Sequence, residues 1–231
     1  MKFTFLILYG ADDVVCKNDA PFYPQMHDLS MLYYEKMRSI YDMDYFYVQY
    51  QPDQVEDVVE VDHHIYLKGK EEFSKIYEKT VKAVQYIRAT HPCDYIIRTN
   101  ISSFWNIPKL FTLSFPSTKC LSGFFMYNLF ISGTGIIMSS DVCDILVSSE
   151  PHICYNYDDV FISKKLVKYA PYHILDSNMM YFLADNEEHK NDIIPEDKSH
   201  ILYFRIKNGQ NRQRDVELFR ILLKDIYDIS A

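Results

Sequence analysis

The sequence predicts an α/β fold for residues 1–231, with a mostly parallel central sheet that becomes mixed in its second half, all within a single domain. The first half of the chain alternates apolar strand-like runs with helical stretches in the order β-α-β-α-β, which is typical of a parallel sheet with right-handed crossovers. After Pro116 the pattern changes to two successive strands and a helix. A chain of 231 residues can bury a sizeable core, and this one contains no internal repeat and no obvious interdomain linker.

Hydrophobic periodicity predicts the strands and helices of the first half. Three apolar runs are typical of strands buried in a sheet: Lys2–Tyr9, Tyr45–Gln49 and Tyr95–Arg98. Apolar residues at helical spacing predict helices at Met31–Tyr41 and Glu71–Thr90. Residues 16–30 contain Pro21 and Pro24 and are expected to form a loop.

A second loop is expected around His63 and His64, which stand beside Asp62 and invite interpretation as a metal site. Adjacent side chains on an extended segment point to opposite faces, so these two histidines cannot easily bind one ion. We therefore expect them to be loop residues.

The uncharged stretch Leu121–Ser140 is long enough to cross a bilayer. It contains three glycines, four serines, Asn128 and Thr134, and its apolar runs are short. Two buried strands joined near Asn128 are therefore expected, with no membrane span. Three helices are predicted after Ser140: near Asp141–Ser148, near Asp159–Tyr169 and at Asp215–Tyr227. Shorter strands are predicted near His173–Leu175, Met180–Leu183 and Ile201–Ile206.

Charge and cysteine content argue against several classes of protein. The formal charge of −8 disfavours non-specific binding to nucleic acid or to an anionic membrane, but is compatible with a local basic pocket for a phosphate. The five cysteines are odd in number, widely spaced and form no C-x-x-C pair, so we expect reduced thiols rather than disulfides or a zinc site. The chain starts with a strand-like run rather than a signal peptide, and a cytoplasmic location is expected.

Two short motifs in the second half suggest chemistry. The run Ser132-Gly133-Thr134-Gly135 leads into a buried apolar strand, and the acidic pair Asp158-Asp159 opens an amphipathic segment further on. Small residues leave room for a polar acceptor, and a carboxylate within hydrogen-bond reach can deprotonate an attacking hydroxyl as a general base. An acidic pair at a helix start can equally cap free N–H groups and interact favourably with the helix dipole. Both interpretations stay open.

These motifs resemble the second half of GT-A-fold glycosyltransferases of the β-1,3-galactosyltransferase type. The usual motif of that family is S-G-x-G-y-x-x-S, followed by E-D-V. Upstream, Arg98–Trp105 resembles the central K-x-D-D-D-x-F-V-N segment of that family, and Tyr77–Thr80 looks like its Y-x-N-L-T-x-K-T region. The text R-T-N-I-S-S-F is also similar to small glycosyltransferases of large DNA viruses and bacteria. The resemblance covers roughly residues 70–165 and implies one GT-A-like (Rossmann-like) domain.

The resemblance implies transfer of a sugar from a nucleoside-diphosphate donor (UDP-, dTDP- or GDP-linked) to a saccharide or glycoconjugate acceptor, with inversion. On the family's E-D-V text, Asp159 takes the position of the general base and Asp158 a neighbouring one. Four residues would line the acceptor site: Trp105, Ser132, Gly133 and Thr134. Trp105 would offer a stacking platform there, or else belong to the core.

Donor-binding residues are expected at two strand ends and in the basic C-terminal segment, because ligands of open α/β sheets bind beyond the carboxyl ends of the strands. The first group follows the first strand, where the ring of the tyrosine could stack on a base: Tyr9, Gly10 and Ala11. The second group follows the third strand: Arg98, Thr99, Asn100, Ser102 and Ser103. The third group would clamp the diphosphate: Arg205, Lys207 and Arg212. The structural alternatives are an ordinary strand-to-loop turn, a turn capped by side chains and a solvated edge strand.

The family's aspartates bind a divalent ion such as Mn²⁺ or Mg²⁺, but uncharged residues stand in their places here, with no carboxylate between Asp94 and Asp141. Hard cations prefer charged oxygen ligands, so any metal is expected to bind weakly, through Asn100 and His200 together with the donor's phosphates. Alternatively, Arg98 and hydroxyl donors would meet the charge of the leaving group.

The missing aspartates also support a rival hypothesis from another class of protein. A non-catalytic carbohydrate- or nucleotide-binding module could retain the same fold after losing its metal carboxylates, because a fold does not fix a function.

Overall fold

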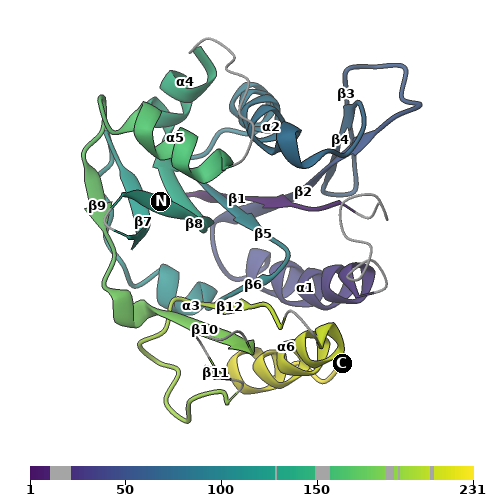
Figure 1. Cartoon of the computed structure of the whole chain (residues 1–231), viewed down its shortest axis with the longest axis vertical. Coiled ribbons are helices and arrows are strands. Elements are labelled where there is room, and N and C mark those ends of the chain that lie inside the picture. The colour runs from purple at the N-terminus through teal and green to yellow at the C-terminus, as the bar shows by residue number, and fades with distance from the viewer. Residues whose placement is uncertain (11–21, 128, 149–156, 186–189, 192, 209–210) are drawn as a thin grey trace. The chain divides into compact units, whose positions relative to one another are not determined.

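The computed structural model describes residues 1–10, 22–127, 129–148, 157–185, 190–191, 193–208 and 211–231 (Figure 1). The chain divides into two compact units, each made of three segments. The first unit comprises Met1–Cys16, Asp42–Asn100 and Phe115–Leu175. The second unit comprises Lys17–Tyr41, Ile101–Ser114 and Asp176–Ala231. The expectation that residues 1–231 form one domain stays a prediction.

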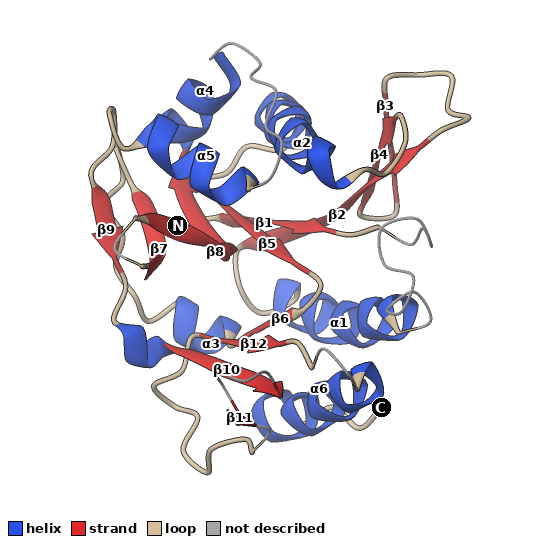
Figure 2. Ribbon diagram, viewed as in Figure 1, coloured by secondary structure: helices blue, strands red, loops and turns tan. Residues whose placement is uncertain are grey.

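The first unit is built on an eight-stranded sheet with the strand order β3-β4-β2-β1-β5-β8-β7-β9 (Figure 2). Its strands in chain order are β1 (Phe3–Leu8), β2 (Met43–Gln51), β3 (Val58–Val61), β4 (His64–Lys68), β5 (Tyr95–Asn100), β7 (Leu121–Met126), β8 (Phe130–Ser139) and β9 (Tyr172–Ile174). Strands β4, β2, β1 and β5 are parallel to one another, whereas β8 is antiparallel to both β5 and β7. The predicted sheet, mostly parallel and then mixed, is therefore confirmed.

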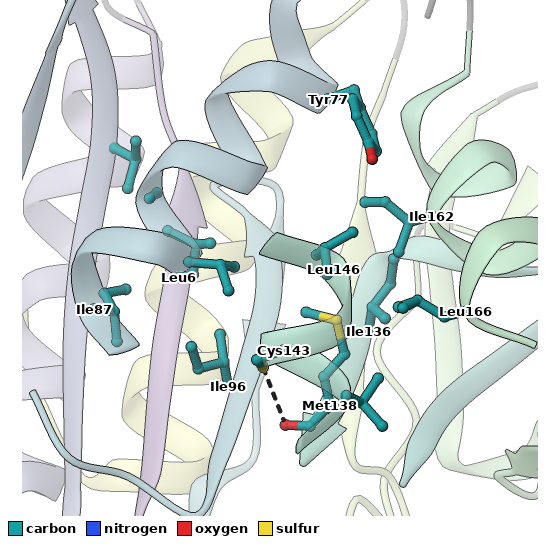
Figure 3. Close-up of a cluster of buried hydrophobic side chains, with 14 of the residues drawn as sticks. Leu6, Tyr77, Ile87, Ile96, Ile136, Met138, Cys143, Leu146, Ile162 and Leu166 are labelled. Atoms are coloured by element: carbon teal, nitrogen blue, oxygen red, sulfur yellow. Dashed lines mark hydrogen bonds between the residues drawn. The ribbon is translucent and has the colours of Figure 1, made fainter. Parts of the chain in front are cut away.

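Three helices cover one face of this sheet: α2 (Ile76–Thr90), α4 (Ser140–Ser148) and α5 (Asp158–Leu166) (Figure 2). A short 3-10 helix, η1 (Phe73–Lys75), precedes α2. Figure 3 shows the buried side chains that join sheet and helices, among them Leu6, Ile87, Ile96, Ile136, Met138, Leu146, Ile162 and Leu166. Each fully buried aliphatic side chain of this kind contributes about 1.5–3 kcal/mol to folding, so this cluster holds the helices in place over the strands.

The cysteines that the structure describes are free thiols, as the sequence predicts: Cys93, Cys120 and Cys143. Burial raises the pKa of each thiol, to about 12 for Cys120. The thiol of Cys143 contacts the carbonyl oxygen of Met138 at 3.8 Å (Figure 3). These three side chains therefore act as small apolar core groups, while Cys16 and Cys154 lie outside the described residues.

The uncharged stretch that could have crossed a bilayer forms β7 and β8, which confirms the two predicted strands; their junction at Asn128 lies outside the described residues. A bulge in β7 follows Gly123, whose φ is +155°. A Cβ at this glycine would lie 2.3 Å from Ile131 Cγ2, so only glycine fits there. None of the helices in the described ranges has the length and apolar character needed to cross a membrane.

The loop expected around His63 and His64 is instead a β-hairpin, made of β3 and β4. Asp62 and His63 form its tight turn with positive φ angles of 46° and 63°, and His64 is the first residue of β4. The imidazole of His63 stacks on the ring of Tyr45 at 4.5 Å between centroids. Tertiary packing of this kind stabilises a turn that the polar text around it does not reveal.

The second unit contains a four-stranded sheet in the order β11-β10-β12-β6 and three α-helices (Figure 1). Its elements in chain order are α1 (Tyr23–Arg38), β6 (Ser103–Trp105), α3 (Ile107–Leu110), the 3-10 helix η2 (Ser177–Met179), β10 (Met180–Asp185), β11 (Lys190–Asn191), β12 (Tyr203–Ile206) and α6 (Arg212–Tyr227). Aromatic rings join α1, β6 and α6, since Tyr33 stacks on Tyr227 at 5.1 Å and packs against Phe104 at 4.8 Å. These contacts form the core of this unit.

The predicted loop at residues 16–30 is wrong from Tyr23 onward, because α1 begins there and ends at Arg38 rather than Tyr41. Pro24 occupies the first turn of α1. A proline is tolerated at that position, since the first N–H groups of a helix have no intrahelical partner to lose. Pro24 therefore marks the start of helix α1 and not a loop.

Candidate active site at the strand ends

The clearest polar cluster of the first unit surrounds Arg98 at the carboxyl end of β5. The Arg98 side chain is buried, and its guanidinium donates from Nη1 to the carbonyl oxygen of Gly133 on β8 and from Nη2 to Oδ2 of Asp158. Its Nε–H is buried without a hydrogen-bond partner among the described residues. Arg98 therefore links three elements, β5, β8 and the start of α5, through charge-assisted hydrogen bonds.

Asp159 makes a second link between α5 and β8. Its Oδ2 accepts a hydrogen bond from the Gly133 N–H at 2.9 Å, and its Oδ1 accepts one from Val160 N–H at 2.8 Å. Tyr157 is the N-cap residue of α5 and makes no side-chain capping bond. The two carboxylates thus lie in the first turn, where they favour the helix dipole, but their side chains mainly reach β5 and β8.

The two aspartates differ in their electrostatic surroundings. Burial raises the pKa of Asp158, the Arg98 guanidinium opposes that shift, and the nearby Asp159 carboxylate adds to it. Asp158 is engaged by a buried cation, whereas the donors to Asp159 among the described residues are the neutral N–H groups of Gly133 and Val160. Each Asp159 oxygen has a second lone-pair direction beyond the N–H bond that it accepts. Asp159 can therefore accept a hydrogen bond from an incoming hydroxyl while it keeps its bonds to the two N–H groups.

Gly133 is required by the close approach of these groups. A Cβ built on Gly133 would lie 2.4 Å from Nη1 of Arg98 and 3.1 Å from Cβ of Asp159. The first distance is shorter than real Cβ contacts, so any side chain here would displace the guanidinium.

We expect Gly133→Ala to lower the free energy of unfolding by about 1–3 kcal/mol, the usual effect of forcing an extra methyl group into a packed interior. Urea-induced unfolding monitored by circular dichroism measures this change. Ser132→Ala is the matched control, because it lies next to Gly133 on β8 and adds no atom beside Arg98. A Gly133→Ala variant as stable as wild type would contradict the close approach described here.

Neighbouring hydroxyl and amide groups join β5 to the small-residue run of β8. The Thr99 hydroxyl donates to the Thr134 carbonyl at 2.7 Å, and Asn100 Nδ2 donates to the Gly133 carbonyl at 3.4 Å. The hydroxyls of Ser132 and Thr134 lie 3.0 Å apart. The structure therefore brings the segment predicted to bind the donor and the small-residue segment predicted to bind the acceptor together with the acidic pair.

A second buried cluster follows β1 and contains an ion pair, Glu71 with Lys79, that the sequence did not predict. Lys79 on α2 donates to both carboxylate oxygens of Glu71 at 2.7 Å and to the carbonyl oxygen of Tyr9 at 3.0 Å. The ring of Tyr9 is buried and packs edge-on against Tyr47. The predicted stacking of the Tyr9 ring on a base therefore does not fit this structure. After β1, the main chain of Tyr9 and Gly10 is the part that a ligand could contact. Ala11 lies outside the described residues.

In the second unit, several predicted donor-binding residues lie together in a buried polar cluster. Arg212 donates to Asp215, and its Nη2 lies 3.5 Å from the Ser102 hydroxyl. Ser103 on β6 pairs with Arg205 on β12. Burial lowers the pKa of Arg205 to about 10, and the charge of the nearby Arg212 adds to this shift. Lys207, which follows β12, is exposed.

Trp105 is a core residue, so the interpretation of its ring as a stacking platform for the acceptor is wrong for this structure. Its side chain is completely buried and stacks on Tyr203 at 4.6 Å between ring centroids. Its carbonyl oxygen accepts a hydrogen bond from the Tyr227 hydroxyl. From the sequence alone, a single tryptophan could pack in the core or stack on a sugar. Its position on β6 places the Trp105 ring in the core.

The predicted metal ligands, Asn100 and His200, belong to different units. No group of three or more His, Cys, Asp or Glu side chains suited to a metal occurs among the described residues. Asn100 uses its amide nitrogen on the Gly133 carbonyl, and His200 is exposed beside Asp197, 3.6 Å away. Weak binding of a divalent cation, with the donor's phosphates as further ligands, stays a prediction.

Comparison with solved structures identifies the fold. The chain is similar to a glycosyltransferase involved in the glycosylation of the major capsid of PBCV-1, with a TM-score of 0.53 and 11% identity over 96% of this chain and 100% of that one. It is also similar to an active-site mutant of LgtC, a galactosyltransferase, with a TM-score of 0.50 and 8% identity over 94% and 95% of the two chains. No protein-family model and no curated protein sequence matches this chain. The chain therefore has the GT-A fold of these glycosyltransferases, which confirms the expected fold.

Proposed function

We propose that this protein is a glycosyltransferase that moves a sugar from a nucleoside-diphosphate donor to a saccharide or glycoconjugate acceptor with inversion. The observation that carries the proposal is the position of Asp158 and Asp159, which Arg98 and Gly133 hold at the carboxyl end of β5. Ligands of open α/β sheets bind at such strand ends. The GT-A fold adds support by analogy, since enzymes of this kind share it.

In the proposed reaction an acceptor hydroxyl attacks the anomeric carbon of the donor sugar. The new carbon–oxygen bond forms as the bond to the diphosphate breaks, and the nucleoside diphosphate leaves with the bonding electron pair. Asp159 takes the proton of the attacking hydroxyl, while Asp158 stays paired with Arg98 and keeps α5 in position. Ser132 and Thr134 offer hydroxyls that can hydrogen-bond to the acceptor.

The contacts of Arg98 support a role different from the one expected from the sequence. Because its guanidinium is engaged by Asp158 and the Gly133 carbonyl, Arg98 positions the acidic pair instead of neutralising the leaving diphosphate. Binding of the donor stays a prediction for the described residues of both units: Gly10, Thr99, Asn100, Ser102, Ser103, Arg205, Lys207 and Arg212. A cytoplasmic location is likewise part of this proposal.

A nucleoside-diphosphate sugar is expected to raise the melting temperature of the protein, and a ligand at a hundredfold over its Kd adds about 2.7 kcal/mol of stability. A thermal-shift screen of uridine, deoxythymidine and guanosine diphosphates and their sugars measures this, with Mn²⁺ and with EDTA. Nucleoside monophosphates serve as the control. A flat melting temperature across the whole panel would contradict donor binding.

The second candidate is a non-catalytic module that binds nucleotide sugars, and one observation favours it. Asp158 is engaged by a buried arginine, and the described residues gather no set of metal carboxylates. A wild-type protein that binds a nucleotide sugar but transfers it neither to water nor to any acceptor would support this candidate over the enzyme.

A further inference from the structure

The buried ion pair of Glu71 and Lys79 joins the ends of two strands in the first unit. The Lys79 side chain is 4% exposed and the Glu71 side chain 6% exposed. The Lys79 ammonium donates to both Glu71 oxygens and to the carbonyl oxygen of Tyr9, directly after β1. Glu71 Oε1 also accepts a hydrogen bond at 2.7 Å from the main-chain N–H of Tyr50, near the end of β2.

Every strong donor and acceptor of this network has a partner. A lysine ammonium has three protons, and Lys79 has three acceptors. The main chain runs very close to the pair, since a Cβ on Gly10 would lie 3.3 Å from the carboxyl carbon of Glu71. The pair therefore fixes the path of the chain as it leaves β1.

A buried ion pair of this kind contributes little net stability, because the cost of desolvating two charges offsets most of their attraction. Burial lowers the pKa of Lys79, and the Glu71 carboxylate opposes that shift. What the pair supplies is geometry: it fixes the Tyr9 carbonyl and the Tyr50 amide relative to each other and to α2.

We propose that Glu71 and Lys79 form a positioning pair for the nucleoside-diphosphate sugar. They hold the main chain at Tyr9 and Gly10 in the conformation that binds the donor. This inference rests on the proposed function and deepens it. Lys79 is too buried to contact the donor itself, so it acts through the Tyr9 carbonyl.

Three variants test the pair in the chain of 231 residues. Glu71→Gln keeps an oxygen acceptor for the Tyr50 N–H but leaves the buried Lys79 ammonium without its counter-charge, and should weaken donor binding less than the loss of both links does. The double variant Glu71→Leu/Lys79→Met removes both links and should raise Kd and KM at least about tenfold, with a smaller change in kcat. Gly10→Ala keeps the pair but presses a methyl group on Glu71, and should also weaken donor binding.

The matched control is Arg88→Met/Asp144→Leu, which removes another ion pair of α2. Arg88 Nε lies 2.8 Å from Asp144 Oδ1, and this pair is far more exposed. Donor Kd is measured by titration calorimetry with the best nucleotide sugar of the screen, and folding is checked by circular dichroism. The control should bind the donor as wild type does.

Two results would overturn the inference while leaving the proposed function intact. In the first, the double variant and Gly10→Ala both bind the donor as tightly as wild type. In the second, the Arg88/Asp144 control weakens binding as much as the double variant, which would indicate a general loss of stability. If wild type itself binds no nucleotide sugar, the proposed function fails, and the inference fails with it.

Discussion

Replacing Asp159 by asparagine is expected to lower the rate of sugar transfer by about 10²–10⁴, the usual effect of losing a positioned general base. An amide cannot take the proton of the attacking hydroxyl, yet its oxygen can still accept the hydrogen bond from Gly133 N–H. The melting temperature and the donor Kd should therefore stay close to those of wild type. Steady-state release of the nucleoside diphosphate, measured beside the Kd, separates these effects.

Asp158→Asn is the parallel variant, and it distinguishes the roles within the pair. Because Asp158 is the ion-pair partner of buried Arg98, Asp158→Asn should lower the stability of the protein more than Asp159→Asn does. If Asp159→Asn transfers sugar at the wild-type rate while Asp158→Asn does not, the assignment of the base is wrong. If both variants melt far below wild type, the pair serves the structure rather than the reaction.

Arg98→Met is expected to lower the free energy of unfolding by about 3–5 kcal/mol, because it leaves the Asp158 carboxylate without its cation. The Gly133 carbonyl also loses a donor. The double variant Arg98→Met/Asp158→Leu removes both charges and should recover more than half of that loss. Urea-induced unfolding of wild type, both single variants and the double variant measures the coupling between the two residues.

Equal losses in the single and double variants would contradict this expectation. They would indicate that the unpaired Asp158 carboxylate adds little to the loss, and that the Gly133 carbonyl left without its donor accounts for it.

The sequence predicts best those elements whose pattern is long and regular. The apolar runs of β1, β2 and β5 and the periodic face of α2 have only one consistent interpretation. The sequence does not reveal the hairpin of β3 and β4, because Val58–Val61 is only four residues long and is flanked by polar residues. Its turn depends on contacts such as that of His63 with Tyr45, which no local pattern encodes.

At the candidate site, the sequence could predict which residues take part, but it could not predict which side chains bind one another. The motifs place Arg98, Gly133 and Asp159 at strand and helix ends, and the structure brings them together. That Arg98 is engaged by Asp158 depends on the register between β5 and β8 and on the docking of α5. The burial of Lys79, which lies in the Tyr77–Thr80 motif, could not be predicted, because a lysine on a helix is almost always exposed unless a partner such as Glu71 is buried with it.

The interleaving of the two units constrains the order in which the chain can become structured during synthesis. Each unit is assembled from three separate segments, so no single cut in the gene separates one from the other. Lys36 donates to the Tyr227 carbonyl across 191 positions of the chain. Helix α1 therefore leaves the ribosome long before α6 has been synthesised. Until then, the apolar face of α1 that packs against α6 has no partner to cover it. Truncation before α6 should expose that face and make a nascent chain prone to aggregate.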